Sequence, residues 1–468
     1  MAPVDPFERS WSDAVNVPFW LDREDAPEPA APLTADTNAD LVVVGGGFTG
    51  LWAAIQAREL DPTRDIVIVE QETVAFGASG RNGGFCDSSL THGLRNGVER
   101  FPEEIVRIER LAAENFDGIR DSIERFAIDC GWTPTGTMSV AVEPYQVHQL
   151  RRGEERYRSF GQRVRFLDRD EVRTEVASPT YLAGLWGLDH NALVDPARLA
   201  WGLRRAALEL GIRVHEHTKA TGIEPEGDGV VVATPSGEVH ARRAILATNA
   251  FPPLARSIRR YVIPVYDYVL MTEPLTPDQL ASIGWRNRQG LADAGNQFHY
   301  YRLSDDDRIL WGGYDAIYHF GNGVSPELED RPETFTRLAE HFFATFPQLE
   351  GIRFTHRWAG AIDTCSRFCA MWGTALGGRA SYVVGYTGLG VGASRFGARV
   401  ALDLISGMET ELTKLRLVRS RPTPFPPEPI RYAGIQLTRR AIARADRREG
   451  RRGPWLKLID AMGLGFDS

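Results

Sequence analysis

The sequence predicts an α/β protein, α+β overall, whose two domains are interleaved along the chain. Three features carry this prediction. Residues 39–71 read as a strand, a glycine loop, a helix and a second strand. Residues 212–250 read as a meander of short alternating strands, and residues 261–320 read as further strands that are rich in aromatic side chains.

Length and composition limit the class of protein. The chain has 468 residues, of which 43% are hydrophobic and 25% are charged, and its net charge is −8. No apolar stretch is long enough to span a membrane, and the N-terminus lacks the pattern of a signal peptide, so we expect a cytoplasmic protein. Its 4 cysteines are too few and too scattered for a disulfide framework, and no second Cys or His pair at ligand spacing accompanies Cys365 and Cys369, so we expect no zinc site. We expect no metal.

The remaining elements follow in order along the chain. Residues 1–39 are predicted to form an extended arm whose aromatic side chains dock on the body. Residues 101–190 are mostly helical in pattern. A helix over 194–211 has a cap at Asp195, Pro196 in its first turn and Gly211 at its end. Another helix is expected around 331–346, and a last one follows the glycine-rich stretch at 385–392.

The first glycine loop has the spacing of a dinucleotide-binding, Rossmann-like unit. Gly45 allows a tight turn, Gly47 lets the backbone approach a pyrophosphate, and Gly50 lets helix and strand pack closely. Glu70 ends the next strand and can accept hydrogen bonds from a ribose diol. The pyrophosphate would lie at the helix N-terminus, where free N–H groups favour it. Neighbouring contacts are expected from Phe48, Thr49 and Gln71.

Two further glycine-rich segments favour a flavin over a nicotinamide. A flavin's ribityl chain and ring must pass close to backbone, and the segment at 76–85 provides both glycines and polar side chains. The late loop would bring N–H groups and a helix N-terminus to the pyrimidine side of the same ring, where they stabilise negative charge. The predicted contacts are Ser79, Arg81, Asn82, Gly83 and Gly84 in the first segment, and Thr387, Gly388, Leu389, Gly390 and Val391 in the second.

These segments together resemble the FAD-dependent D-amino-acid oxidase superfamily, which includes glycine and sarcosine oxidases. Within it, they are most similar to gamma-glutamylputrescine oxidoreductase-type proteins. The resemblance spans about residues 39–408 and rests on "VVVGGGFTGL", "ASGRNGGF", "LVDPARL", "ILATNA", "MTEPL", "RWAGAIDT" and "GYTGLGVGAS". It implies amine oxidation by hydride transfer to FAD, and contacts to FAD from Ala220 and Thr248.

The resemblance also implies a discontinuous FAD-binding domain and a substrate domain whose sheet covers the flavin. The FAD-binding domain is expected at 40–100, 191–260 and 355–408. The substrate domain is expected at 101–190 and 261–354, between the N-terminal arm (1–39) and a basic helical tail (409–468).

The chain departs from the family pattern at the substrate clamps. Where sarcosine-type members carry a cysteine bonded to flavin, this chain has Ala361, so FAD should be non-covalent. The position of the carboxylate-binding arginine falls at or near Ile362, and that of a lysine after the late loop falls at Gly392. A buried carboxylate without a cationic partner is costly. The expected substrate is therefore an extended amine, gamma-glutamyl-polyamine-like, rather than a simple α-amino acid.

Hydride transfer needs an oriented neutral amine in a dry pocket. We take His299, Tyr301 and Asp363 as the candidate catalytic residues. In the strand at 298–302, His299 and Tyr301 share one face while Tyr300 and Arg302 share the other, and one pair should face the pocket. Asp363 could recognise a cationic nitrogen, or it could bind only the backbone of its own loop.

Two alternatives to an amine oxidase stay open at this point. The chain has only three lysines, and none is placed to promote reaction of flavin with O2. The acceptor is therefore O2 or another electron acceptor, and a flavin dehydrogenase of an amino acid or 2-hydroxy acid is the first rival. The second rival is a flavin-bearing RNA-modifying or RNA-binding module that uses the arginines of residues 431–468. We expect instead that this tail packs on the acidic body, without nucleic acid or membrane.

Overall fold

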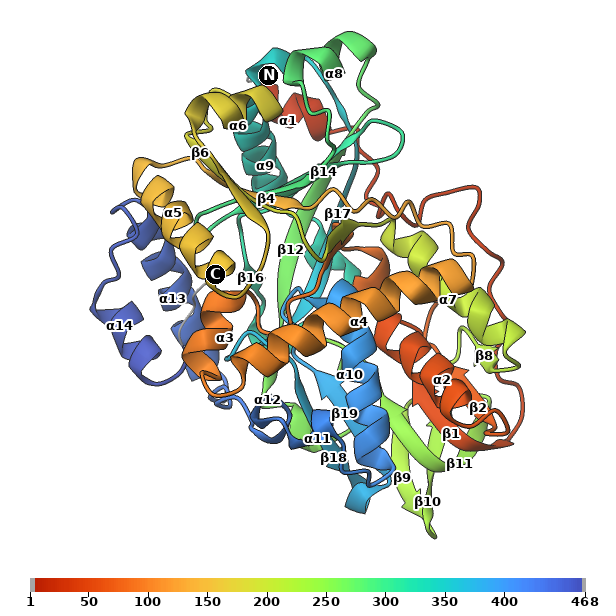
Figure 1. Cartoon of the computed structure of the whole chain (residues 1–468). Coiled ribbons are helices and arrows are strands. Elements are labelled where there is room, and N and C mark those ends of the chain that lie inside the picture. Colours follow the sequence, from red (N-terminus) through yellow and green to blue (C-terminus); the bar gives the residue numbers. More distant parts are fainter. Residues whose placement is uncertain (1–4, 465–468) are drawn as a thin grey trace.

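The computed structural model describes residues 5–464, and Figure 1 shows them as two sheets flanked by helices. The helices are α1 (Pro6–Trp11), α2 (Phe48–Leu60), α3 (Leu94–Arg100), α4 (Ile105–Arg125), α5 (Pro144–Ser159), α6 (Arg169–Glu175), α7 (Pro196–Glu209), α8 (Pro277–Ile283), α9 (Pro332–Thr345), α10 (Gly390–Ile405), α11 (Glu411–Lys414), α12 (Arg416–Arg419), α13 (Ile430–Asp446) and α14 (Pro454–Ala461).

The first sheet has a parallel centre with an antiparallel meander beside it. Strands β1 and β2 pair in parallel, as do β1 and β11, β11 and β19, and β2 and β8. Its main path is β18 (Met371–Ala375), β19 (Ala380–Val384), β11 (Gly237–Leu246), β1 (Thr37–Val44), β2 (Ile66–Val69) and β8 (Arg213–His215), and the meander adds β10 (Gly229–Thr234) and β9 (Gly222–Glu226). This confirms the predicted Rossmann-like unit and the meander.

Alternate side chains of the first sheet enter two different cores. Leu41 and Val43 of β1 pack with helices α2, α4, α7 and α10, whereas Val42 and Val44 pack with the meander. Both faces of the central strands are therefore buried, as in other parallel sheets. Helix α7 begins as predicted, because the Asp195 side chain accepts a hydrogen bond from the N–H of Arg198.

The second sheet is mixed and carries α9 on one face. Its path is β16 (Ile317–Tyr318), β12 (Val262–Thr272), β15 (Ile309–Gly313), β14 (His299–Leu303), β13 (Gly290–Asp293), β4 (Thr137–Ala141), β6 (Ala183–Gly187) and β5 (Val164–Leu167), with β17 (Phe354–Cys365) beside β12. Tyr266, Tyr268 and Leu270 pack with Phe335 and Phe342 of α9. The other face of β12 is left for the space between the two sheets. A short pair, β3 (Phe85–Asp87) and β7 (Asn191–Leu193), lies apart from both.

The structure places two of the domain boundaries differently from the sequence-based expectation. Strand β17 pairs with β12 along its whole length, so residues 354–365 belong to the second sheet rather than to the FAD-binding domain. Helix α4 packs in the core of α2, α7 and α10, so residues 105–125 lie with the first sheet rather than with the substrate domain. Sequence order alone could not assign either segment, because both join one sheet to the other.

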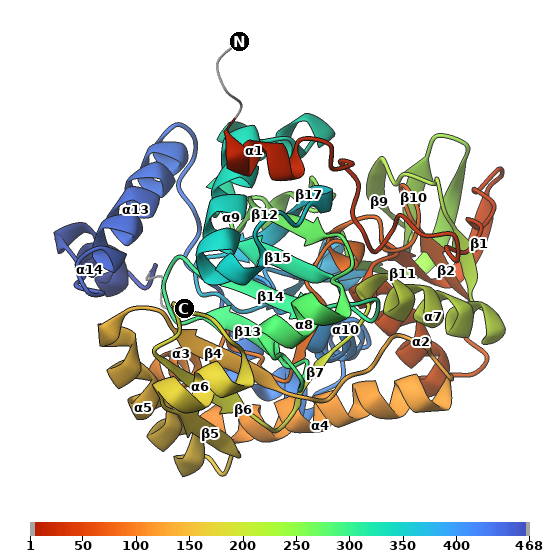
Figure 2. The ribbon, with the colours of Figure 1, turned by 90° about the horizontal axis from the view of Figure 1, so that it is seen from above.

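Both ends of the described chain pack against the body. Trp11, Phe19 and Trp20 of the N-terminal arm are buried, as expected, although residues 6–11 form a helix instead of extended chain. Helices α13 and α14 stand at the side of the second sheet that is remote from β1 and β2 (Figure 2). The arm therefore covers one part of the second sheet and the tail covers another.

Replacing Trp20 tests how strongly the arm is docked. Trp20 is 2% exposed, packs with Val269 and Trp358, and donates its indole N–H to the carbonyl of Asn82 at 2.9 Å. Trp20→Ala should cost about 3–5 kcal/mol of packing free energy and lower the midpoint of thermal unfolding of the FAD-saturated protein. Val17→Ala, at a residue that is 40% exposed, is the control and should leave the midpoint nearly unchanged. Equal midpoints for the two variants would contradict a docked arm.

Candidate active site

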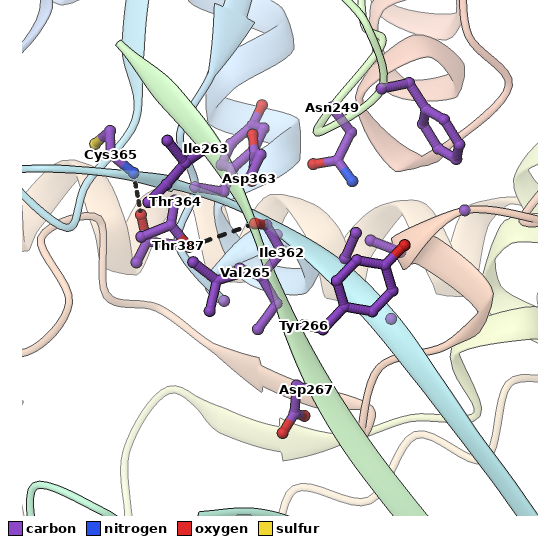
Figure 3. Close-up of a pocket in the computed structure, with 18 of the residues that line it drawn as sticks. Asn249, Ile263, Val265, Tyr266, Asp267, Ile362, Asp363, Thr364, Cys365 and Thr387 are labelled. Atoms are coloured by element: carbon purple, nitrogen blue, oxygen red, sulfur yellow. Dashed lines mark hydrogen bonds between the residues drawn. The ribbon is translucent and has the colours of Figure 1, made fainter. Parts of the chain in front are cut away.

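One long cavity of about 1060 Å³ lies between the two sheets. One end is lined by Glu70, Lys219 and Ala220, and its middle is lined by the glycine segments and by β12 and β17. Figure 3 shows Ile263, Val265 and Asp267 of β12 along this middle part, with Ile362, Asp363 and Thr364 of β17 beside them. The volume lies at the upper end of the range for small-molecule sites, which suits a large cofactor together with a substrate.

The first glycine loop has the close approaches that its spacing predicts. Gly45 has φ of +113°, which side-chain-bearing residues rarely adopt. A Cβ on Gly50 would lie 1.9 Å from the carbonyl oxygen of Gly45, so the N-terminus of α2 can pack here only as glycine. The N–H of Phe48 donates to Ser79 Oγ at 3.0 Å. Loop and helix N-terminus thus present backbone to the cavity.

Glu70 holds this loop through its carboxylate. One oxygen accepts the N–H of Gly46 at 2.6 Å and the other accepts the N–H of Glu72 at 3.0 Å. Burial raises the pKa of Glu70, and the two backbone donors act against that rise. A carboxylate fixed in this way can still accept from a ribose hydroxyl with its remaining lone pairs.

The second glycine segment is held by its own side chains. The Arg81 guanidinium pairs with Glu329 at 2.5 Å and donates to the carbonyl of Ala359 at 3.0 Å. The Asn82 amide donates to the carbonyls of Ala78 and Ser79. These side chains therefore fix the loop as well as facing the cavity.

The late loop is tied to β17 by Asp363. Its carboxylate accepts the N–H of Gly385 at 2.6 Å, and its carbonyl accepts the N–H of Thr387 at 3.2 Å. Burial raises the pKa of Asp363 to about 7. Asp363 lines the cavity, but most of its hydrogen-bond acceptor sites are used by the loop. Of the two roles that the sequence allowed, amine recognition and binding of its own loop, this geometry favours the second.

Most of the predicted cofactor contacts lie together in the cavity wall. The wall includes Gly45, Gly47, Phe48, Thr49, Glu70, Gln71, Ser79, Arg81, Asn82, Gly83, Ala220, Thr248, Thr387, Gly388, Leu389, Gly390 and Val391. Gly50 and Gly84 do not line it. Gly50 serves helix packing, as expected. A Cβ on Gly84 would lie 2.1 Å from the carbonyl oxygen of Val194, so this glycine serves chain packing and not, as predicted, room for the flavin ring.

His299 and Tyr301 lie on the wrong face of β14 for substrate contact. His299 stacks on Trp311 with ring centroids 4.5 Å apart, and its Nε2 lies 2.9 Å from Nδ1 of His341. The Tyr301 hydroxyl lies 2.7 Å from that of Tyr181. Neither residue lines the cavity, because α9 covers this face of the sheet. The expectation that both act on the substrate is therefore corrected.

Tyr300 and Asp267 are the pair that faces the cavity. The Tyr300 hydroxyl donates to Asp267 Oδ2. Burial raises the pKa of Asp267 to about 6, while hydrogen bonds from Tyr300 and from backbone N–H groups act against the rise. Our interpretation of the sequence missed Asp267. Its signal was a single carboxylate in the aromatic strand "VYDYV", on the face opposite to the two tyrosines.

At the positions that the resemblance assigns to substrate clamps, this chain has no cation. Ala361 and Ile362 line the cavity between the two sheets. A Cβ on Gly392 would lie 1.8 Å from the carbonyl oxygen of Asp87, so no lysine side chain fits there. The Cys365 thiol donates to the carbonyl of Cys369 at 3.1 Å, and burial raises its pKa. It is thus a neutral structural thiol rather than an activated nucleophile.

The far end of the cavity is formed by the tail, which carries no recognised motif. Phe298, Tyr314 and Asp315 line this end from the second sheet, and residues of α13 and α14 line it from the tail. The predicted packing of the tail on an acidic group is seen between Arg439 and Asp315, at 3.6 Å. That the tail also forms part of the site was not predicted.

Comparisons with known proteins now identify the family. The family model described as FAD dependent oxidoreductase matches residues 40–404. The chain belongs to this family. It is 32% identical to gamma-glutamylputrescine oxidoreductase of Escherichia coli over 387 residues, which covers 81% of this chain and 86% of that protein. It is 27% identical to the probable oxidoreductase OrdL of Haemophilus influenzae, over 84% of this chain and 89% of that protein.

The fold agrees with solved members of the family. The glycine oxidase of Geobacillus kaustophilus superposes with a TM-score of 0.66 at 20% identity, over 82% of this chain and 99% of that one. The protein is accordingly an FAD-dependent oxidoreductase, with the family's cofactor and fold. The cavity fits that cofactor, because backbone at the N-termini of α2 and α10 lines it, and a Cβ on Gly388 or Gly390 would meet no atom within 4 Å, so these glycines open onto free space.

Two further findings concern the described residues alone. Within 5–464, the structure has no cluster of three or more His, Cys, Asp or Glu side chains that could hold a metal ion. Nor does any helix in that range have the length and hydropathy needed to cross a bilayer.

Changing Glu70 to glutamine tests its hold on the cofactor loop. Both carboxylate oxygens accept backbone N–H groups, so in Glu70→Gln the new amide nitrogen would have to face one of these donors. We expect the dissociation constant of FAD to rise about tenfold to a hundredfold, measured by fluorescence titration of apoprotein. Glu224→Gln, on exposed β9, is the control. Unchanged affinity in the Glu70 variant would contradict this role.

Proposed function

We propose that this oxidoreductase oxidises the C–N bond of an extended amine, such as a gamma-glutamyl-polyamine, to an imine that water then hydrolyses. One observation carries the proposal: a buried carboxylate, Asp267, faces the cavity, and the neighbouring Ile263, Val265 and Ile362 offer no cation that could receive an α-carboxylate beside it. The similarity to gamma-glutamylputrescine oxidoreductase of Escherichia coli supports the same class of substrate.

Asp267 is the carboxylate best suited to hold the amine. Of the acidic residues in the cavity wall, Glu70 and Glu72 lie at the dinucleotide end, Asp363 binds its loop, and Asp315 pairs with Arg337. Within residues 5–464, Asp267 has no ion-pair partner, and its hydrogen bond comes from the neutral Tyr300. A substrate ammonium would provide the missing countercharge.

The chain's own groups prepare the amine for oxidation. An alkyl ammonium has a pKa near that of lysine, about 10, so it binds as a cation. Asp267 Oδ can accept one of its protons, which leaves the nitrogen lone pair free, and Tyr300 keeps the carboxylate oriented. FAD, when bound, supplies the acceptor for the hydride from the carbon next to nitrogen. Ile263, Val265 and Ile362 keep this region apolar and exclude water.

We further propose O2 as the electron acceptor. The balanced reaction is then amine, O2 and water giving carbonyl compound, ammonia or a smaller amine, and H2O2. The lysines give this acceptor no support. Lys219 lies at the dinucleotide end and Lys414 lies outside the cavity wall, so neither can provide a positive charge beside the reacting amine. Rapid reoxidation of the reduced protein in air would support an oxidase, and slow reoxidation would favour a dehydrogenase.

The first experiment is an anaerobic screen for bleaching of the flavin absorbance. Monoacylated butane-1,4-diamines should bleach it, while glycine, sarcosine and D-alanine should not. The small amino acids test whether the region around Ile362 can hold an α-carboxylate without an arginine. Bleaching by these and not by the extended amines would overturn the proposed substrate class.

The pH dependence of flavin reduction should report Asp267. Its pKa is raised to about 6, so the carboxylate is ionised above this pH and lost as pH falls through it. The apparent second-order rate constant of flavin reduction should therefore decrease as the pH is lowered below about 6, which gives the pH profile an acidic limb. Asp267→Asn should remove this limb and slow reduction about a hundredfold. Tyr300→Phe removes a hydrogen bond that lowers the pKa, so it should move the limb to higher pH. An unchanged limb in Asp267→Asn would contradict the assignment.

A further inference from the structure

The C-terminal tail contributes to the cavity although it lies outside the part of the chain that defines the family. The family model ends at residue 404. Beyond that point, a group of residues nevertheless lines the far end of the cavity: Phe425, Pro426, Ile430, Arg431, Gly434, Ile435, Thr438, Trp455, Ile459, Met462 and Leu464. This part of the cavity wall thus comes from residues that follow the family match.

The tail is fixed to the second sheet on both sides of this wall. Asp446 at the end of α13 accepts from the Asn296 amide at 2.5 Å and from the N–H of Gln297 at 3.0 Å. Near the start of α13, the Glu428 carboxylate accepts from the Tyr318 hydroxyl. These contacts place α13 beside the second sheet at the far end of the cavity.

The wall that the tail provides is apolar except for one cation. Ile435, Trp455 and Ile459 form most of it, and Arg431 is its only charged side chain within residues 5–464. The other arginine of the cavity wall, Arg81, is already paired with Glu329. Arg431 is therefore the cation available to a ligand group at this end.

Arg431 is held in place with one nitrogen left over. Its Nε donates to the carbonyl of Pro426 at 2.9 Å, and its Nη1 donates to Asn322 Oδ1 at 2.7 Å. Its Nη2 has no hydrogen-bond partner among the described residues. The nearby Glu428 carboxylate accepts from the N–H groups of Gly321 and Tyr432 instead. Although burial acts to raise it, the pKa of Glu428 is lowered by its hydrogen bonds and also by the Arg431 guanidinium, so this carboxylate offsets part of the charge of Arg431. The oxygens of Glu428 are used by other donors, however, and the guanidinium keeps Nη2 for an incoming anion.

We propose that Arg431 binds a carboxylate at the end of the substrate that is remote from the reacting nitrogen. The chain between the two ends would lie along Ile435 and Trp455. This inference rests on the proposed amine oxidation at Asp267, and it adds the substrate's second charged group. The substrate is then an amine at one end and a carboxylate at the other, joined by an uncharged spacer.

A matched pair of substrates isolates the remote charge. N-glutaryl-butane-1,4-diamine ends in a carboxylate, and its terminal primary amide has the same length and shape without the charge. Dissociation constants come from the rate of anaerobic flavin bleaching as a function of amine concentration. The wild-type protein should bind the carboxylate at least about tenfold more tightly than the amide, as expected for a charge-assisted hydrogen bond.

Variants of two arginines on α13 then test which side chain binds the remote carboxylate. Arg431→Gln should abolish the preference for the carboxylate and leave binding of the amide unchanged, while Arg431→Lys should retain part of it. Arg440→Gln is the matched control, since Arg440 is exposed on α13 and does not line the cavity. Unchanged thermal midpoints in all three variants would show that the tail stays folded.

The outcomes separate this inference from the function on which it rests. If both amines bleach the flavin but bind the wild-type protein equally, or if Arg431→Gln keeps the preference, the remote carboxylate site is wrong and amine oxidation stands. If neither amine bleaches the flavin, both proposals fall together.

Discussion

The cavity depends on a single buried carboxylate at the seam between the sheets. Asp363 lies near the end of β17, the strand that pairs with β12, and it accepts the N–H of Gly385 at the start of the late glycine loop. The hydrogen bond from the N–H of Cys365 to Thr387 Oγ1 lies beside it. Because this contact joins the second sheet to the late glycine loop, it fixes the position of that loop at the cavity. A residue of this kind cannot also be free to bind substrate.

Backbone and side chains have separate roles in this site. The segments that face the cofactor are glycine-rich, and their glycines are required by approaches such as that of Gly50 to Gly45. The segments that face the substrate are strands whose alternate side chains can change without altering the pleat. A position such as Ile362 can therefore vary while the fold and the cofactor loops stay those of the family.

The sequence predicted the cofactor loops well because their constraints are local. Glycine spacing, a strand before it and a helix after it all lie within about thirty residues of one another. Which face of β14 meets the cavity was not predictable in the same way. Alternation separates His299 and Tyr301 from Tyr300, but only the packing of α9 decides which face is covered. That packing joins residues far apart in the chain, and no local pattern reports it.

The tail shows why composition can mislead about a site. Its many arginines draw attention to nucleic acid or to an acidic surface, yet the cavity receives mainly its apolar side chains and Arg431. Charge inside a cavity acts differently from charge on a surface, because less water screens it. A carboxylate at Asp267 and a guanidinium at Arg431 would each favour the opposite charge on the ligand, and the apolar wall between them penalises charge in the middle. Such an arrangement selects a substrate by the separation of its charged groups, which neither end could do alone.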